Sequence, residues 1–288
     1  MSSPFRLDGV FTVLPTAFHG DGGLDLASTA ALVRAAVDAN VSGLTVLGVM
    51  GEAAELTEDE RQKVVACVRE TTSLPIVVGV SGDTGSAVEN RARNAAAGGV
   101  AGLMVSPSRS LDLAGAVAAA GAAGLPILIQ DYPAGSGVHV TTTELATVAT
   151  GQPLVVGVKA EAPPSSGRIA SLRATNPDLG LLGGLGGLFL IDELRAGANG
   201  VMTGFALPEQ LVSVVEIFRS DEVTATATWE ALLPLMRLEA FQPFSLAARK
   251  EVWRLRGVIE SSHCRRPGAV LDGRARDDVR RAFERVYR

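Results

Sequence analysis

The stretch Ala97-Gly98-Gly99-Val100-Ala101-Gly102 lies between an alanine-rich segment and the apolar run Leu103-Met104-Val105. Glycine readily adopts the positive φ that the end of a helix needs, so this stretch predicts a helix, a turn and a strand in that order. Similar junctions occur at 39–43 and at 196–200. Their recurrence indicates repeated β–α units rather than separate helical and sheet regions.

Short apolar runs alternate with longer alanine-rich stretches along most of the chain. Most of the runs are apolar at successive residues, which is typical of parallel strands that are covered on both faces. We therefore expect an α/β protein with a (β/α)8 TIM barrel over residues 1–220. The expected strands are 10–16, 43–48, 75–80, 101–106, 126–131, 154–160, 179–183 and 200–204.

The alternation stops near residue 220 and is followed by helical patterns. No linker composition separates this part from the barrel, so we expect residues 221–288 to form a C-terminal helical extension packed on it. The length of 288 residues suits one α/β barrel with such an appendage. The expected helices are 223–238, 244–257 and 274–287.

Composition narrows the classes of partner. A net charge of −5 argues against nucleic acid or an anionic membrane as the main partner. Cys67 and Cys264 lie far apart without a CxxC motif, and the three histidines lack metal-ligand spacing, so we expect no disulfide, metal or cofactor. The first residues lack the basic segment and apolar stretch of a secretory signal, and we expect a cytoplasmic protein.

Lys159 ends the apolar run Leu154-Val155-Val156-Gly157-Val158-Lys159 and is one of only three lysines among 26 basic residues. Burial at the end of a strand disfavours the ammonium and favours a neutral amine, which can attack a carbonyl and form a Schiff base. The alternative is a lysine that reaches solvent, as most lysines do. Lys63 and Lys250 stand among charged residues on expected helices, and we expect both at the surface.

The active site of a (β/α)8 barrel lies where the strands end and the following loops converge. Lys159 ends the sixth expected strand, which favours the functional interpretation. Other polar or turn-forming residues at the same edge are Thr16, the turn 48–52, Ser81, Ser106, residues 130–132, Glu161, residues 183–187 and Thr203.

Seven short motifs occur along the whole chain: Val13-Leu14-Pro15-Thr16-Ala17-Phe18, then 21–25, Gly48-Val49-Met50-Gly51-Glu52, 56–61, 125–129, Val156-Gly157-Val158-Lys159 and 197–201. In this order and spacing they resemble the dihydrodipicolinate synthase and N-acetylneuraminate lyase family of class I aldolases. The resemblance implies that Lys159 forms an imine with pyruvate or another 2-oxo acid. It also implies a homodimer or homotetramer.

The chain departs from the family pattern in the second loop. Family members usually carry hydroxyl side chains where this chain has Val49 and Met50. The backbone N–H groups of the turn, which includes Gly51, can still bind a carboxylate, but a proton relay through its side chains is lost.

A second departure follows the fifth expected strand. A gapless comparison puts Gln130 where the family has a tyrosine, and Gly135 where synthases have an arginine for their second substrate. Tyr132 lies two residues beyond Gln130, so it can face the same side of the strand. These replacements argue against dihydrodipicolinate synthase activity.

Glu161 can share a strand face with Lys159. A carboxylate beside the imine nitrogen can hold free Lys159 as an ammonium, or carry a proton to a leaving hydroxyl. The alternative is a glutamate that leaves the strand and pairs with Arg109 or Arg168. Residues 183–187 match neither phosphate-loop nor Rossmann spacing, so we expect a tight turn that lets the backbone at Gly184 approach the substrate.

We therefore expect a lyase, either aldolase or dehydratase, that acts through Lys159 on pyruvate or a 2-oxo-3-deoxy sugar acid. Tyr132 and Glu161 are the candidates for proton transfer. One alternative is a small-molecule binding or regulatory protein that has lost the reaction, and another is a dihydrodipicolinate synthase with shifted acid–base groups. The residues expected to contact substrate are Thr16, Val49, Met50, Gly51, Gln130, Gly184 and Thr203.

Overall fold

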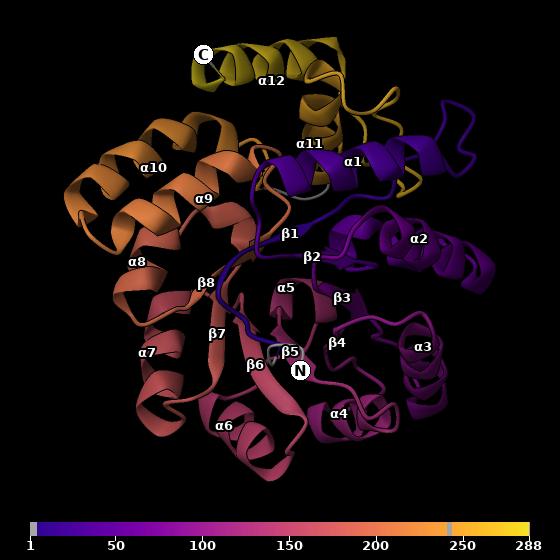
Figure 1. Cartoon of the computed structure of the whole chain (residues 1–288), viewed down its shortest axis with the longest axis vertical. Coiled ribbons are helices and arrows are strands. Elements are labelled where there is room, and N and C mark those ends of the chain that lie inside the picture. The colour runs from indigo at the N-terminus through magenta and orange to yellow at the C-terminus, as the bar shows by residue number, and fades with distance from the viewer. Residues whose placement is uncertain (1–4, 241–243, 288) are drawn as a thin grey trace.

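A computed structural model describes residues 5–240 and 244–287. Its strands form a closed parallel barrel in chain order, with the first strand paired to the eighth (Figure 1). The expected (β/α)8 fold is confirmed. The strands are β1 (Gly9–Val13), β2 (Gly43–Val46), β3 (Ile76–Gly79), β4 (Gly102–Val105), β5 (Ile127–Asp131), β6 (Val155–Ala160), β7 (Gly180–Gly183) and β8 (Gly200–Thr203).

Each expected range overlaps one strand, but every range is too long at one or both ends, and β1 begins one residue earlier than expected, at Gly9. The largest excess is in the first, which was expected to reach residue 16 and ends as a strand at Val13. Leu14 still donates to the carbonyl of Thr45, after which pairing stops. The run misleads because Leu14 and Ala17 remain buried beyond the strand, so apolar sequence continues where the ladder does not.

Helices surround the barrel, and short turns lie in the loops at its mouth. Helix α2 begins with the capping box of Thr57 and Glu60, in which each residue bonds the backbone of the other. The surrounding helices are α1 (Leu26–Asp38), α2 (Glu58–Thr71), α3 (Gly85–Ala97), α4 (Leu113–Gly121), α6 (Thr142–Gly151), α7 (Ser165–Thr175), α8 (Leu190–Arg195) and α9 (Pro208–Phe218). The short turns are η1 (Val49–Gly51), η2 (Ala53–Glu55), α5 (Pro133–Ser136) and η3 (Leu185–Gly187).

Three helices follow the barrel: α10 (Glu222–Met236), α11 (Phe244–Leu255) and α12 (Gly273–Val286). Figure 1 shows α10 alongside α9, and α12 at the outer end of the molecule beyond α11. The expected boundary at 220/221 falls between α9 and α10, and the division into two domains stays a prediction. Within the described residues, no helix is long and apolar enough to cross a membrane.

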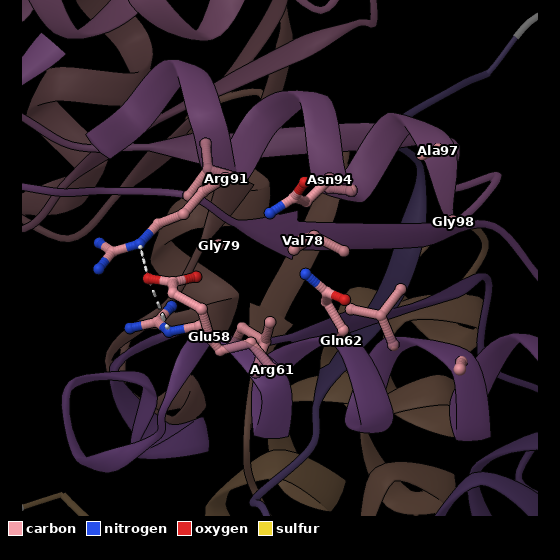
Figure 2. A pocket seen from close by; sticks show the side chains of 14 residues that line it. Glu58, Arg61, Gln62, Val78, Gly79, Arg91, Asn94, Ala97 and Gly98 are labelled. Atoms are coloured by element: carbon pink, nitrogen blue, oxygen red, sulfur yellow. Dashed lines mark hydrogen bonds and ion pairs between the residues drawn. The ribbon is translucent and has the colours of Figure 1, made fainter. Parts of the chain in front are cut away.

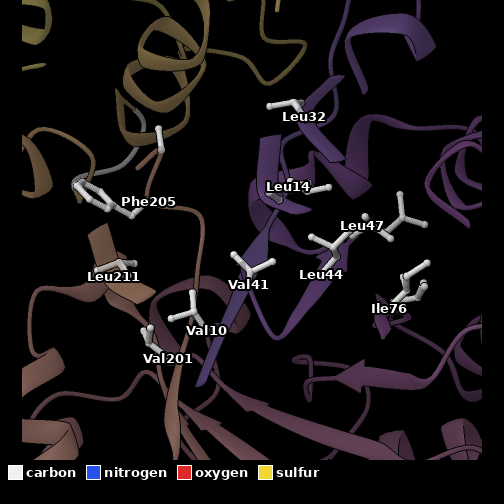
Figure 3. Packing of buried hydrophobic residues seen from close by; sticks show 14 of the residues in the cluster. Val10, Leu14, Leu32, Val41, Leu44, Leu47, Ile76, Val201, Phe205 and Leu211 are labelled. Carbon is white, nitrogen blue, oxygen red and sulfur yellow. The ribbon is translucent and has the colours of Figure 1, made fainter. Parts of the chain in front are cut away.

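The core has two parts on either side of the barrel wall. The larger part lies between strands and helices; Figure 3 shows Leu44 and Val201 on strands, with Leu32 of α1 and Leu211 of α9 among the buried side chains around them. The inner part fills the barrel with Leu7, Phe11, Val13, Val77, Met104, Leu128, Leu182 and Met202. This inner plug closes the barrel below its mouth, so the side chains above it line a pocket rather than a channel.

Candidate active site

Lys159 lies at the mouth of the barrel, directly above the inner plug. In the sheet it is paired with Gln130 of β5 on one side and with Leu182 of β7 on the other. Side chains alternate along a strand, and Gln130 stands two residues after the inward-facing Leu128. The inward face thus changes from apolar to polar at Gln130 and Lys159, and the side chain of Lys159 is only 6% exposed.

Glu161 provides the carboxylate nearest to Lys159. Its Oε2 lies 3.2 Å from Lys159 Nζ and accepts a hydrogen bond of 2.8 Å from Gln130 Nε2. Its Oε1 accepts a bond of 3.2 Å from the backbone N–H of Leu185. Strand β6 ends one residue earlier, but Glu161 N still donates to Asp131 O, which keeps the side chain aimed into the barrel mouth.

The alternative pairing of Glu161 with Arg109 or Arg168 does not occur. Arg168 Nε lies 3.2 Å from Asp131 Oδ2 on the neighbouring strand end, and its Nη1 donates to Val140 O. The arrangement therefore separates two carboxylates that are close in the sheet: Asp131 is held by Arg168, and Glu161 is held by Lys159 and Gln130.

Gly184 explains how Glu161 fits beside the glycine-rich turn. A Cβ on Gly184 would lie 2.5 Å from Cγ and Oε1 of Glu161, so any larger residue would displace the carboxylate. A Cβ on the preceding Gly183 would similarly collide with the buried carboxylate of Glu193. The expectation that the glycines bring the backbone to the substrate stays untested. In the structure they make room for two carboxylates.

Tyr132 caps the N-terminus of α5 and lines the cavity around Lys159. Burial and the charge of Glu161 raise the pKa of its phenol, while Arg249 and Arg266 oppose the rise. Its ring occupies the space beside Gly135, where an added Cβ would lie 2.4 Å from the ring carbon Cδ1. The ring of Tyr132 therefore leaves no room for a side chain at position 135.

The turn η1 forms the wall contributed by β2. Val49 and Met50 line the cavity together with Thr203 at the end of β8. Gly51 and Thr16 lie behind this wall: Thr16 Oγ1 donates a hydrogen bond of 2.6 Å to Gly51 O. Among the described residues that line the cavity, Thr16, Gly51 and Gly184 are absent, so these three shape its walls from behind.

The expectation for Lys250 is wrong, because its side chain is fully buried. Its Nζ lies 2.5 Å from Glu52 Oε1 and donates to His263 O, and Glu52 Oε2 accepts from the backbone N–H of Arg266. The charged sequence around Lys250 is misleading because residues 245–253 of α11 are all buried. Buried charges persist when they are paired, and this pair fastens α11 to the end of η1.

Comparison with known proteins gives the same family that the seven short sequence motifs predict. The model of the Dihydrodipicolinate synthetase family matches residues 6–286. The chain belongs to this family. L-2-keto-3-deoxyarabonate dehydratase of Azospirillum brasilense is 31% identical over 282 residues, which cover 92% of this chain and 90% of that protein.

Other members of the dihydrodipicolinate synthetase family extend the comparison. The 4-hydroxy-tetrahydrodipicolinate synthase of Stenotrophomonas maltophilia is 30% identical, with 83% of this chain and 81% of that protein covered. The crystal structure of dihydrodipicolinate synthase from Rhodopseudomonas palustris superposes with a TM-score of 0.91 at 34% identity, covering 96% of this chain and 97% of that one. The named dehydratase and synthases support a lyase function for this chain, of the aldolase or dehydratase type.

Sequence reasoning missed the contribution of α11 to the mouth of this family's barrel. Arg249 and Ser245 line the same cavity as Lys159, although they lie almost 90 residues further along the chain. Both are buried. No spacing or motif signals them, because only the packing of the C-terminal extension brings this face of α11 to the strand ends.

A separate groove lies on the outside of the barrel, between α2 and α3. Figure 2 shows the carboxylate of Glu58 between the guanidinium groups of Arg61 and Arg91, and the buried Val78 and Gly79 of β3 also line the groove. Arg91 Nη1 also donates to Ser81 O at the end of β3. The groove contains neither Lys159 nor Glu161, so it is distinct from the candidate active site.

One group of side chains could hold a metal ion by distance alone. Ligand atoms of His19, Asp25 and Glu260 lie within 4.8 Å of one another. Asp25 already caps α1, where its Oδ1 accepts from Ser28 N. None of the three lines the described cavity around Lys159.

Proposed function

We propose that this protein is an imine-forming dehydratase that acts on a 2-oxo-3-deoxy sugar acid through Lys159. The observation that carries the proposal is the buried pair of Lys159 and Glu161, held by Gln130 at the open end of a closed barrel. An amine and a carboxylate in contact provide both a nucleophile and an acid–base group at one place.

The pair can carry the reaction through imine formation. The ammonium of Lys159 passes a proton to Glu161, and the free amine attacks C2 of the 2-oxo acid. Glu161 returns the proton to the carbinolamine hydroxyl, which leaves as water and gives the protonated imine. The positive nitrogen then withdraws electrons from C3, which makes the C3–H bond acidic.

Elimination uses the same carboxylate a second time. Glu161 takes the proton from C3, the enamine expels the C4 hydroxyl, and the proton held by Glu161 leaves with it as water. Hydrolysis of the resulting conjugated imine consumes one water and frees Lys159. Because formation of the imine releases one water, the net loss from the substrate is one water. Tyr132 lines the same cavity and is the second candidate for proton transfer.

The substrate carboxylate is assigned to the η1 wall. Strands β2 and β6 lie opposite each other in an eight-stranded ring, so the turn after β2 faces Lys159 across the mouth. The backbone N–H of Val49, which lines the cavity, can bind a carboxylate without the missing hydroxyl side chains, whereas Gly51 N already donates to Gly48 O within the turn. Thr203 and Gln130 complete the contacts that we assign to the substrate.

A dehydratase is favoured over a synthase for two reasons. The ring of Tyr132 fills the space at Gly135, so no side chain at that position can reach a second substrate. A relative named as a 2-keto-3-deoxy sugar acid dehydratase matches over 92% of the chain. We expect condensation of pyruvate with aspartate semialdehyde to be negligible, and normal turnover in that assay would overturn the preference.

Borohydride trapping tests the imine. The protein is incubated with pyruvate and with a panel of 2-oxo-3-deoxy sugar acids, reduced, and analysed by intact mass and peptide mapping. We expect one adduct on Lys159, and none in a Lys159→Met variant. An unmodified Lys159 across the panel would sink the proposal and favour a protein that only binds small molecules.

The assembly is part of the proposal as well. We propose a homodimer or homotetramer, and light scattering coupled to gel filtration measures it. One of the matched structures, 25% identical, is described as a monomeric dihydrodipicolinate synthase variant, so a monomer is the outcome that would contradict this part.

A further inference from the structure

Arg249 places a buried guanidinium at the barrel mouth. The residue is 5% exposed, although it comes from α11 of the extension. Its Nη2 lies 3.4 Å from the position of a Cβ on Gly186, and its Nη1 lies 3.2 Å from that position on Gly204. The side chain thus crosses the gap between the loops that follow β7 and β8, and two glycines leave room for it.

The charge of Arg249 is only partly neutralised within the protein. Its Nε lies 3.4 Å from Oε2 of the fully buried Glu239. Its Nε is buried without a hydrogen-bond partner, and its terminal nitrogens donate no hydrogen bond to a described residue. Arginine presents its remaining N–H groups as a planar fork that fits a carboxylate. Because Arg249 lines the cavity, a ligand there can supply an acceptor to these terminal N–H groups.

Ser245 adds a second donor on the same wall. It precedes Arg249 by one helical turn, so both side chains lie on one face of α11. The residue is 1% exposed, lines the cavity, and its Oγ has no hydrogen-bond partner in the described part of the chain. A buried hydroxyl beside a buried guanidinium makes a polar patch in a wall that otherwise includes Ala240, Gly186 and Gly204.

The end of the substrate that does not react should point toward Arg249 and Ser245. Glu161 leans from β6 toward the β7 loop, where it touches Gly184 and bonds Leu185 N. The carbons that Glu161 must reach, C3 and C4, therefore lie on the β7 side of Lys159. Arg249 lies against Gly186, further along the same loop, so the remaining end of the substrate extends to Arg249 and Ser245.

We propose that Arg249 and Ser245 bind a second carboxylate at the far end of the substrate, so that the enzyme prefers dicarboxylic 2-oxo acids. This inference rests on the proposed function, whose site it completes. The substrates that we propose are therefore sugar acids that carry a carboxylate at both ends. Buried charge-assisted bonds to a carboxylate supply this selectivity, because a methyl or hydroxymethyl group would leave the guanidinium unpaired.

Unreactive analogues test the subsite without requiring an imine. Isothermal titration of the full chain compares 2-hydroxyglutarate with 2-hydroxypentanoate, which have the same length and differ in the terminal carboxylate. We expect 2-hydroxyglutarate to bind about tenfold or more tightly. Arg249→Gln should abolish this preference and leave the affinity for 2-hydroxypentanoate within about twofold, and Ser245→Ala should reduce the preference less.

Arg254→Gln is the matched control, because Arg254 is on the same helix, 41% exposed, and paired with Glu251. It should keep the full preference. Equal affinities of the wild-type protein for the two analogues would overturn the inference, whether or not Arg249→Gln folds. An equal loss for both analogues in a folded Arg249→Gln variant would also overturn it. Trapping of pyruvate on Lys159 reports separately on the proposed function.

Discussion

Lys159 Nζ lies 3.2 Å from Glu161 Oε2, and both side chains are more than nine-tenths buried. Two residues apart in sequence, they meet because β6 carries Lys159 inward and the chain continues in the same direction to Glu161. An isolated charge at this depth would be very unfavourable, whereas the pair and Gln130 compensate each other. In the mechanism that we propose, the contact also brings an acid–base group to the nucleophile.

Replacing Glu161 by Gln should separate binding from proton transfer. A glutamine keeps the size of the side chain but cannot exchange protons, so we expect kcat for dehydration to fall by about 100-fold or more. Borohydride should still trap pyruvate on Lys159, but more slowly than in the wild-type protein because Glu161 also assists imine formation; intact mass against incubation time measures it. Glu89→Gln, an exposed change on α3, is the control and should retain full kcat. A fall of less than about threefold for Glu161→Gln would assign proton transfer to another group.

Adding one methyl group at Gly184 should impair catalysis through Glu161. The new Cβ would lie 2.5 Å from the Glu161 carboxylate and push it away from Lys159. We expect kcat/KM to fall by about 100-fold, since small misplacements of catalytic groups have effects of this size. Gly167→Ala in α7 is the matched control, because a Cβ there meets nothing within 4 Å. Equal activities of the two variants would contradict the packing argument.

Removing one partner of the buried pair formed by Lys250 and Glu52 should destabilise the fold. The Lys250→Met variant leaves Glu52 buried without its cation, and we expect a loss of about 3–5 kcal/mol in the free energy of unfolding. Urea denaturation followed by circular dichroism measures it. Lys63, whose pair with Asp59 is exposed, gives the comparison: Lys63→Met should change stability by about 0.5 kcal/mol or less. A small loss for Lys250→Met would mean that Glu52 is solvated.

Glu193 should make stability depend on pH. Burial raises its pKa to about 7 from the usual 4.5, and Ser165 Oγ, which donates to it at 2.6 Å, opposes the rise. The folded protein therefore holds this proton more tightly than the unfolded chain. The stabilisation is fully present below about pH 4.5 and is lost as the pH rises through about 7.

Glu193→Gln isolates that effect. A glutamine can still accept the bond from Ser165 but does not ionise. The variant should gain about 3 kcal/mol relative to the wild-type protein between pH 4.5 and pH 8. Urea denaturation at several pH values in this range measures the difference in free energy. A difference that stays constant with pH would show that Glu193 ionises normally in the folded protein.

Much of the fold was predictable from local sequence. The glycine-containing junctions, the capping box at Thr57 and the continuous apolar runs each depend on residues close together in the chain, so every expected strand is present. Strand ends were less predictable, because Leu14 is buried without being paired. Lys250 shows the same limit: its neighbours are charged, yet the whole helix is enclosed.

Some residues of the candidate site were also predictable from the sequence, and others were not. Lys159, Glu161 and Gln130 were predictable, because an alternating strand and its neighbour fix which side chains face the barrel mouth. The roles of Gly183 and Gly184 were not, since two carboxylates from other elements occupy the space beside them. Arg249 and Ser245 were missed entirely.

The sequence by itself determined the barrel, the place of Lys159 at the end of β6 and the family, because these depend on periodicity and on the order of motifs along the chain. Only the tertiary structure decided which charges are buried and what they touch. Glu52 with Lys250, and Glu193 with Ser165, join elements that are far apart in sequence. Burial and pairing of such groups arise from packing in three dimensions, which local pattern does not encode.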